Sequence, residues 1–253
     1  MRNFPKEDAN KHNGLAYSAD NDKLNLSNLK KRIRFIGHKY SSLSGRTSIG
    51  LKKDAIQFES SLERDYVYLL EFNEDVKGFL EQPLKITYIN DSKRTYTPDF
   101  LVQYHDTEKQ DELVEIKYES QLIKNREILF HKFNAAKSFC RTNDIGFKVI
   151  TEKVIRSNTT YLENIKFLSR YRNYFEILPK HVKVEVTSYH INILDTLDLL
   201  KHVEVKVLLD SLMKKSDLKS EEILFHLWYL IANNFIMCDL SASLNLNSSI
   251  WTD

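Results

Sequence analysis

TYTPDFLVQYHDTEKQDELVEIKYES, residues Thr95–Ser120, predicts the architecture of this chain more clearly than any other segment. It contains two runs rich in β-branched and aromatic residues, DFLVQY at 99–104 and ELVEIK at 112–117. Between them lies HDTEKQD, which has no apolar residue. Two such runs around a polar loop are typical of a β-hairpin. The stretch therefore predicts two antiparallel strands that carry charged residues among side chains suited to a core.

The charged residues of this hairpin meet at one end. If the chain turns at Thr107, Asp99 and Glu115 face each other, since each lies eight residues from the turn. Facing side chains have Cβ atoms about 4.5–5.5 Å apart, and like charges at that distance destabilise a sheet. A cation between them removes the repulsion, and Mg²⁺ is commonly held by one or two carboxylates with water and phosphate. Lys117 shares the face of Glu115, because alternate residues of a strand point the same way.

Two carboxylates, a divalent cation and a lysine form a set that suits a nuclease. The ion would neutralise phosphate charge and lower the pKa of a bound water molecule. Lys117 would orient that water or offset the negative charge that develops on the phosphate. The competing interpretation is structural, because Asp after Pro is common turn chemistry and Glu-X-Lys is common on solvated strands. A register shift of one residue would also separate the carboxylates, so the pattern alone leaves both interpretations open.

Glu63 is a further acidic candidate, on a helix predicted over 58–72 (FESSLERDYVYLLEF). Ser60 followed by Glu63 fits a capping box, in which the glutamate closes the first turn of the helix. If the helix starts earlier, Glu63 shares a face with Val67 and Leu70 and can reach the carboxylate pair from there. The residues themselves leave both roles open.

The elements around the hairpin predict an α/β fold. LKITYIN (84–90) alternates as a strand, and NDSK follows it as a turn. After the hairpin, apolar residues at helical spacing predict a helix over 122–141, and FKVIT (147–151) predicts a short buried strand. A strand, a helix and a second strand form a βαβ crossover, which together with the hairpin gives a mixed sheet with helices on its faces.

The order helix, three-strand meander, P-D, E-X-K, helix and strand is the pattern of the PD-(D/E)XK restriction-endonuclease-like core. Four pieces of the chain, SSLERDYVYLLEF, FLEQP, YTPDFLV and VEIK, closely resemble the TnsA family within about 45–151. Members of that family are the endonuclease subunits of heteromeric cut-and-paste transposases. The resemblance implies a Mg²⁺-dependent DNA endonuclease, with Mn²⁺ as an alternative ion.

The resemblance also implies roles for particular residues. Its catalytic residues correspond here to Glu63, Asp99, Glu115 and Lys117. The metal ligands that it implies are Asp99, Glu115, the Ile116 carbonyl and Glu63. Some members carry Gln at the position of Glu115, whereas Glu agrees with the wider nuclease superfamily. Glu59, one helical turn before Glu63, is an alternative for the acid carried by the helix.

Composition defines the class of protein. The 253 residues carry a net charge of +2, and 42% of them are hydrophobic and 28% charged, as in a globular protein. The sequence has no apolar leader and no run of 18 apolar residues, so we expect no membrane span. Cys140 and Cys238 are far apart and lack metal-like partners, which favours a reducing compartment without zinc. With the family resemblance, this points to the bacterial cytoplasm and nucleoid.

The N-terminal region is basic. Residues 1–44 are expected to be a flexible arm, and the stretch 23–53 contains no acidic residue. A block of one charge often contacts nucleic acid, the alternative being a solvated segment that keeps the protein soluble. The residues expected to contact the DNA backbone are Lys30, Lys31, Arg32 and Arg34.

The rest of the chain predicts a connecting region and a small domain after a nuclease domain at 45–155. The segment 156–195 is expected to hold an aromatic and basic helix and a short strand at 182–186. From 196 to 253, the order helix, turn, helix, strand predicts an all-α or winged-helix-like domain. Its helix SEEILFHLWYLIANN (220–234) has no Lys or Arg, so it suits packing or a protein partner better than a DNA groove. The resemblance implies an ATPase regulator as that partner.

The resulting hypothesis is an endonuclease subunit that hydrolyses the 5′-end phosphodiester bonds at transposon ends. The resemblance implies that a DDE-type transposase subunit cuts and joins the 3′ ends. Two alternatives stay open. One is a stand-alone restriction or repair nuclease with the same core, which would cut DNA without a partner. The other is a non-catalytic DNA-bound scaffold, against which the intact set of acidic residues and lysine argues.

Overall fold

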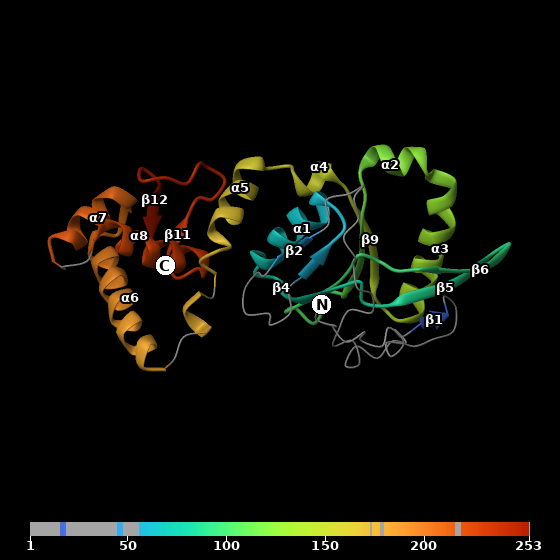
Figure 1. Cartoon of the computed structure of the whole chain (residues 1–253), viewed down its shortest axis with the longest axis horizontal. Coiled ribbons are helices and arrows are strands. Elements are labelled where there is room, and N and C mark those ends of the chain that lie inside the picture. The colour runs from blue at the N-terminus through green and yellow to red at the C-terminus, as the bar shows by residue number, and fades with distance from the viewer. Residues whose placement is uncertain are drawn as a thin grey trace, which may run out of the picture. The chain divides into compact units, whose positions relative to one another are not determined.

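The computed structural model describes residues 16–18, 45–47, 56–172, 174–177, 180–215 and 219–252. These residues form two compact units (Figure 1). The first unit contains residues 57–64 and 73–155 together with the short strand β1, and the second contains residues 65–72 and 156–252. Helix α1 (Ser61–Glu71) therefore contributes residues to both units.

A four-stranded mixed sheet forms the centre of the first unit. Its strands, in spatial order, are β4 (Val76–Glu81), β7 (Phe100–Tyr104), β8 (Glu112–Ile116) and β9 (Gly146–Ile150). Strand β7 is antiparallel to both β4 and β8, whereas β8 and β9 are parallel. Phe100 pairs with Val114, and Leu101 pairs with Leu113. The predicted hairpin and its register are therefore confirmed.

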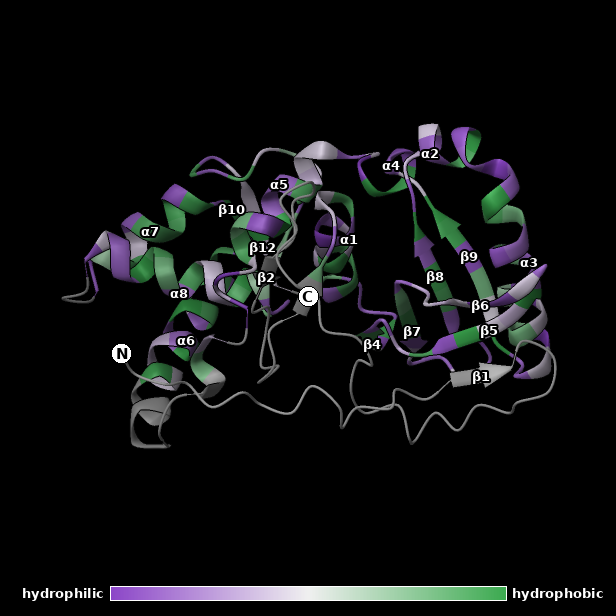
Figure 2. Cartoon of the chain, turned by 45° about the vertical axis from the view of Figure 1, so that its right-hand side comes forward, coloured by the Kyte–Doolittle hydropathy of each residue, from purple (hydrophilic) through white to green (hydrophobic). Residues whose placement is uncertain are grey.

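Two helices connect β8 to β9, and the second of them packs against strands β5 (Lys85–Asn90) and β9. They are α2 (Glu119–Lys124) and α3 (Arg126–Thr142). The single helix predicted over 122–141 is thus interrupted at Asn125, whose φ of −109° and ψ of 22° are not helical. Helix α3 buries Ala136 and Phe139 in the core that also holds Leu113 of β8. Hydrophobic and hydrophilic residues alternate along α3 (Figure 2), as expected for a helix with one face on a sheet.

The first unit also contains a three-stranded sheet. Its strands, in spatial order, are β1 (Ala16–Ser18), β5 (Lys85–Asn90) and β6 (Ser92–Tyr96). Asp91 turns the chain between β5 and β6 with a φ of 57°, a left-handed conformation that Asp adopts more readily than most residues. Ile86 pairs with Tyr96, and both lie in the same core as helix α3. Strand β6 thereby brings Tyr96 into the interior, three residues before Asp99.

The segment before the sheet forms a short strand and then helix α1. Strand β3 (Ile56–Phe58) pairs with β2 (Gly45–Thr47) in a two-stranded sheet. The helix predicted from Phe58 begins instead at Ser61. Its first turn buries Leu62 and Glu63, of which 1% and 9% of the surface is exposed. The short helix α4 (Glu152–Ile155) closes the first unit after β9.

Helices and a small antiparallel sheet make up the second unit. In chain order its elements after α1 are α5 (Thr159–Leu168), η2 (Tyr174–Ile177), α6 (Lys180–Leu200), β10 (His202–Glu204), α7 (Val205–Met213), α8 (Ser220–Ala232), β11 (Met237–Cys238) and β12 (Ser249–Trp251). The strands have the spatial order β10-β12-β11. Both pairings are antiparallel. Because the unit contains this sheet, the expectation of an all-α domain is wrong.

Two local predictions in this unit are also wrong. The strand predicted at 182–186 lies inside α6, because alternation of valine with charged residues over five positions does not outweigh a helix of 21 residues. The single helix predicted from Thr196 is divided in two. Helix α6 ends at Leu200, and Lys201 follows with a left-handed φ of 66°. The next residues form β10 before α7 begins.

Helix α8 lies in the core of the second unit. The six residues of its C-terminal half are all buried, namely Leu227, Trp228, Tyr229, Leu230, Ile231 and Ala232. Six consecutive positions cover every face of a helix, so this half cannot enter a DNA groove. The helix ends at Ala232, and Asn234 follows with a left-handed φ of 60°. At the start of the helix, Glu222 accepts a hydrogen bond from the backbone N–H of Lys219, which caps the first turn.

Within the described parts of the chain, every helix is too short or too polar to cross a membrane.

Candidate active site

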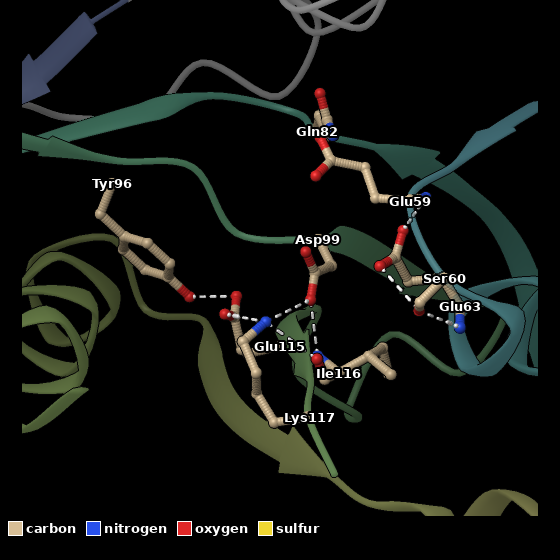
Figure 3. A network of polar contacts seen from close by, with 9 residues as sticks. All are labelled: Glu59, Ser60, Glu63, Gln82, Tyr96, Asp99, Glu115, Ile116 and Lys117. Atoms are coloured by element: carbon tan, nitrogen blue, oxygen red, sulfur yellow. Dashed lines mark hydrogen bonds and ion pairs between the residues drawn. The ribbon is translucent and has the colours of Figure 1, made fainter. Parts of the chain in front are cut away.

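Asp99 and Glu115 meet where strand β7 begins and strand β8 ends (Figure 3). Asp99 directly precedes β7, and Glu115 is the last residue but one of β8. Continuing the observed register by one residue beyond the Phe100–Val114 pair places Asp99 opposite Glu115. Asp99 Oδ2 also accepts a hydrogen bond of 2.7 Å from the backbone N–H of Ile116. The two carboxylates are thus held by the ladder and by a bond to the main chain.

The side chain of Lys117 lies between these carboxylates. Its Nζ is 2.7 Å from Glu115 Oε1 and 3.6 Å from Asp99 Oδ2. It also donates a hydrogen bond of 2.9 Å to the Ile116 carbonyl. Both contacts of Asp99 use Oδ2, which leaves Oδ1 outside them. Lys117 therefore neutralises part of the charge that the register brings together.

The electrostatics of the site show an excess of negative charge. Burial and the charge of Glu115 raise the pKa of Asp99 well above its usual value, and Lys117 offsets only part of this effect. Burial disfavours the charged form of Lys117, but Asp99 and Glu115 outweigh it and raise the pKa of the ammonium. The lysine therefore stays protonated, while the acids around it compete for one cation.

Tyr96 is a member of the site that the sequence did not reveal. Its hydroxyl donates a hydrogen bond of 2.7 Å to Glu115 Oε2. Only 5% of Tyr96 and 4% of Glu115 is exposed. Burial, and then the charges of Glu115 and Asp99, raise the pKa of Tyr96 well above its usual value, so the hydroxyl stays protonated. The sequence does place a tyrosine three residues before Asp99. An aromatic residue in a strand, however, more often packs in the core than contributes to a site.

Glu63 takes the capping role that the sequence allowed. Its Oε1 accepts a bond of 2.9 Å from the Ser60 hydroxyl, and its Oε2 accepts one of 2.7 Å from the backbone N–H of Glu59. Ser60 Oγ in turn accepts a bond of 3.1 Å from the Glu63 N–H, which closes the first turn of α1. Burial raises the pKa of Glu63, and the charge of Lys117 acts against that rise. The glutamate therefore caps the helix within the electrostatic reach of the lysine.

Glu59, the alternative acid, points to a different neighbour (Figure 3). Its Oε1 accepts a bond of 3.4 Å from Gln82 Nε2. Gln82 has a left-handed φ of 45° and is 6% exposed, and its Oε1 has no hydrogen-bond partner among the described residues. Its backbone N–H donates to the Asp99 carbonyl at 2.8 Å. Strained backbone and an unsatisfied buried oxygen beside Asp99 mark Gln82 as a second residue that sequence reasoning missed.

The chemistry of the donors fits a hard divalent cation. Asp99, Glu115 and the Ile116 carbonyl offer oxygen only, the ligand type of Mg²⁺ and Mn²⁺. In the described part of the chain, no three His, Cys, Asp or Glu side chains lie close enough to hold an ion among themselves. Two carboxylates completed by carbonyl, water and phosphate oxygens are nevertheless the usual set for Mg²⁺. The residues present therefore suit an ion that shares its ligands with a substrate.

The basic residues expected to bind DNA are placed as follows. Lys30, Lys31, Arg32 and Arg34 lie outside the described residues. In the second unit, Arg156 Nε and Lys166 Nζ lie 2.8 Å and 2.6 Å from the buried carboxylate of Asp65. Arg172 donates to the Ala232 carbonyl at the end of α8. The three residues thus have internal partners, which favours a structural role over contact with phosphate.

Fold and site together define a class of protein. A mixed sheet that brings an aspartate and a Glu-X-Lys sequence to one end of an antiparallel strand pair is a nuclease-like α/β core. Residues 73–152 match the family model described as TnsA-like endonuclease N terminal. Over this segment the chain is similar to the TnsA-like endonucleases. The segment includes Asp99, Glu115 and Lys117 but not Glu63. No curated protein matches the chain.

Proposed function

We propose that this chain is the endonuclease subunit of a heteromeric transposase and hydrolyses the 5′-end phosphodiester bonds at transposon ends. One observation carries the proposal. Asp99 and Glu115 face each other at the end of a strand pair with Lys117 between them, inside the segment that matches TnsA-like endonucleases. The excess negative charge at this point suits a reaction that combines a cation with a phosphate group.

The residues divide the work of hydrolysis among them. Asp99, Glu115 and the Ile116 carbonyl would hold Mg²⁺ or Mn²⁺, with Glu63 beside them. When bound, the ion neutralises phosphate charge and lowers the pKa of a water molecule. In the metal-free site Asp99 and Glu115 raise the pKa of Lys117 and keep it protonated, which favours a hydrogen-bond donor over a general base. It instead donates hydrogen bonds, orienting the water or offsetting the charge that develops on the phosphate.

The other parts of the reaction fall to the basic arm and to partner proteins. The residues Lys30, Lys31, Arg32 and Arg34 would hold the DNA backbone without reading its sequence. A DDE-type transposase subunit would recognise the transposon ends and cut and join the 3′ strands. This division follows from the family, whose members act within heteromeric transposases.

For the second unit we propose a winged-helix-like domain that docks an ATPase regulator. The order helix α6, strand β10, helices α7 and α8, and strands β11 and β12 supports the winged-helix assignment. Helix α8 has no Lys or Arg, opens with Glu221 and Glu222, and is buried over its C-terminal half. A protein partner therefore suits this domain better than the major groove.

Strand cleavage tests the proposal. Transposon-end DNA is incubated with the chain and its partner transposase in Mg²⁺, in Mn²⁺ and in chelator, and the 5′ ends produced are mapped. We expect metal-dependent cuts at the transposon termini that fall by at least about 10³-fold in Asp99→Asn, since losing several kcal/mol of charge stabilisation has that effect. Glu112→Gln is the matched control, because Glu112 lies at the other end of β8.

The alternatives give different results in the same assay. A stand-alone nuclease would cut equally well without the partner and away from the transposon termini. A non-catalytic scaffold would leave cleavage unchanged in Asp99→Asn, with the cut strands then attributable to the partner.

A further inference from the structure

Glu115 has both of its carboxylate oxygens engaged, each by a different side chain. Oε2 accepts the bond from the Tyr96 hydroxyl, and Oε1 faces Lys117 Nζ, both at 2.7 Å (Figure 3). The final torsion of a glutamate has a broad energy profile, so the backbone alone does not fix the plane of the carboxylate. In this site the hydrogen bond from Tyr96 holds the plane of the Glu115 carboxylate. Because Oε2 is bound to the tyrosine, Oε1 is the oxygen that faces Lys117.

Tyr96 is itself held firmly. Its ring lies in the core of the first unit with Leu101, Leu113 and Phe139, and its backbone pairs with Ile86 in the β5–β6 sheet. The hydroxyl therefore projects from a packed ring toward Glu115. The site thus depends on a strand, β6, that carries none of the residues expected from the sequence to be catalytic.

A second tyrosine–glutamate bond, within the β7–β8 hairpin, provides an internal comparison. Tyr104 donates a hydrogen bond of 2.8 Å to Glu112 Oε2. These residues lie at the opposite ends of β7 and β8 from Asp99 and Glu115. The two bonds have the same chemistry and nearly the same length, and only the bond of Tyr96 reaches the site.

We propose that Tyr96 is a positioning residue of the nuclease site, which holds Glu115 Oε2 so that Oε1 is presented to Lys117 and to the bound cation. The inference rests on the proposed function, because it assigns Tyr96 a part in the binding of that cation. Hydrogen bonds that orient ligands in this way change metal affinity or activity by about 10–100-fold when they are removed.

The test compares Tyr96→Phe with Tyr104→Phe in the full chain. Mn²⁺ affinity is measured by isothermal titration calorimetry, DNA affinity by fluorescence anisotropy, and cleavage with the partner transposase under single-turnover conditions. We expect Tyr96→Phe to weaken Mn²⁺ binding by about 10–100-fold and to leave DNA affinity unchanged. Its cleavage rate constant should fall at low Mn²⁺ and recover as Mn²⁺ is raised. Tyr104→Phe should match the wild type in all three measurements.

A second variant keeps the test decisive if Tyr96→Phe does not fold. Glu115→Asp retains both the charge and the tyrosine but withdraws the carboxylate from the hydroxyl. We expect its Mn²⁺ affinity to fall by at least as much as in Tyr96→Phe, because Glu115 is itself proposed to bind the ion. Where both variants fold, adding Tyr96→Phe to Glu115→Asp should weaken binding no further, because the bond from the tyrosine is already broken. Wild-type affinity in Glu115→Asp would overturn the inference.

The outcomes separate this inference from the proposed function. If the wild type binds Mn²⁺ and cuts DNA, but Tyr96→Phe has the same Mn²⁺ affinity as Tyr104→Phe, the hydroxyl only satisfies a buried acid and the inference is overturned. If the wild type neither binds Mn²⁺ nor supports cleavage, the proposed function fails and the inference falls with it.

Discussion

Asp65 and Asp99 are two aspartates with opposite charge balances, the first buried and the second partly exposed. Asp65 is 2% exposed and lies between two cations, Arg156 and Lys166. Burial alone would raise the pKa of Asp65, but the hydrogen bonds from Lys166 and Arg156 lower it. Among the described residues the cation beside Asp99 is Lys117, which Asp99 shares with another acid, and the pKa of Asp99 is raised.

The balance of acids and cations separates a structural ion network from a site that needs a ligand. Around Asp65 the cations outnumber the acid, so the second unit satisfies this charge internally. Around Asp99 the acids outnumber the cation, so the first unit holds a charge that an external cation can complement. The burial of a carboxylate does not distinguish a structural ion network from a ligand site. The balance of charges around the carboxylate distinguishes them.

The largest expected effect is the response to metal. Mn²⁺ at about 100 times its dissociation constant should raise the free energy of unfolding of the first unit by about 2.7 kcal/mol. Asp65→Asn should keep this gain, whereas Asp99→Asn should lose it, because only Asp99 would bind the ion. Urea titrations with and without Mn²⁺, followed by circular dichroism, measure the difference. Equal gains in the two variants would remove the distinction between the two aspartates.

The next effect is on stability without metal. Asp65→Asn should lower the free energy of unfolding by about 2 kcal/mol, since removing one partner of a buried pair leaves its cations uncompensated. We expect less than the full penalty because Arg156 and Lys166 are themselves 35% and 29% exposed. Asp99→Asn should cost little or stabilise the protein, as it removes a repulsion. Denaturation in chelator tests this, and a larger loss in Asp99→Asn would contradict it.

The third effect is a pair of opposite pH dependences, neither steeper than about 1.4 kcal/mol per pH unit. The pKa of Asp65 is lowered by folding, so its stabilisation is present above about pH 4 and is lost as the pH falls through the folded pKa. The pKa of Asp99 is raised by folding, so its contribution is full below about pH 4 and is lost as the pH rises through the folded pKa.

Unfolding of each Asp-to-Asn variant beside the wild type, in chelator from pH 3 to pH 8, measures the two dependences. The stability difference between wild type and variant should grow with pH for Asp65→Asn and shrink with pH for Asp99→Asn. Slopes of the same sign would show that the two sites carry similar charge balances after all.

The smallest effect concerns backbone strain beside Asp99. Gln82→Gly should be more stable than Gln82→Ala by about 0.5–1 kcal/mol, because only glycine adopts the observed left-handed φ without strain. Gln121 in helix α2 supplies the control. There glycine should be less stable than alanine by about 1 kcal/mol. Thermal unfolding of the four variants checks the reversal, and the same order at both positions would exclude strain at Gln82.

The sequence predicted the end of the hairpin correctly for a physical reason. Strand residues alternate with a period of two, and a polar loop with a clear centre fixes the register, so Asp99 and Glu115 could be placed opposite each other. The strand predicted at 182–186 failed because a five-residue alternation is compatible with a helix stabilised by its neighbours. A local sequence pattern predicts structure well where it specifies which strand residues pair. It predicts poorly where tertiary packing determines whether a segment is helix or strand.

The residues that escaped prediction share one property. Tyr96 reaches Glu115 from a strand of a different sheet, and the left-handed φ of Gln82 belongs to a non-glycine residue before Pro83. Neither feature leaves a periodic trace in the sequence. Glu63 shows a further limit, since the capping box and the site were treated as alternatives, yet the same carboxylate closes the helix near Lys117.

Lys117 gives this protein a built-in counter-ion. Because an ammonium attached to the chain already offsets one of the facing carboxylates, the hairpin does not need an ion from solution to close in register. The protein can therefore be synthesised and purified in the presence of a chelator with its strands correctly paired. Under the proposed function, folding of the site would not depend on metal binding, and the metal would be the last component added.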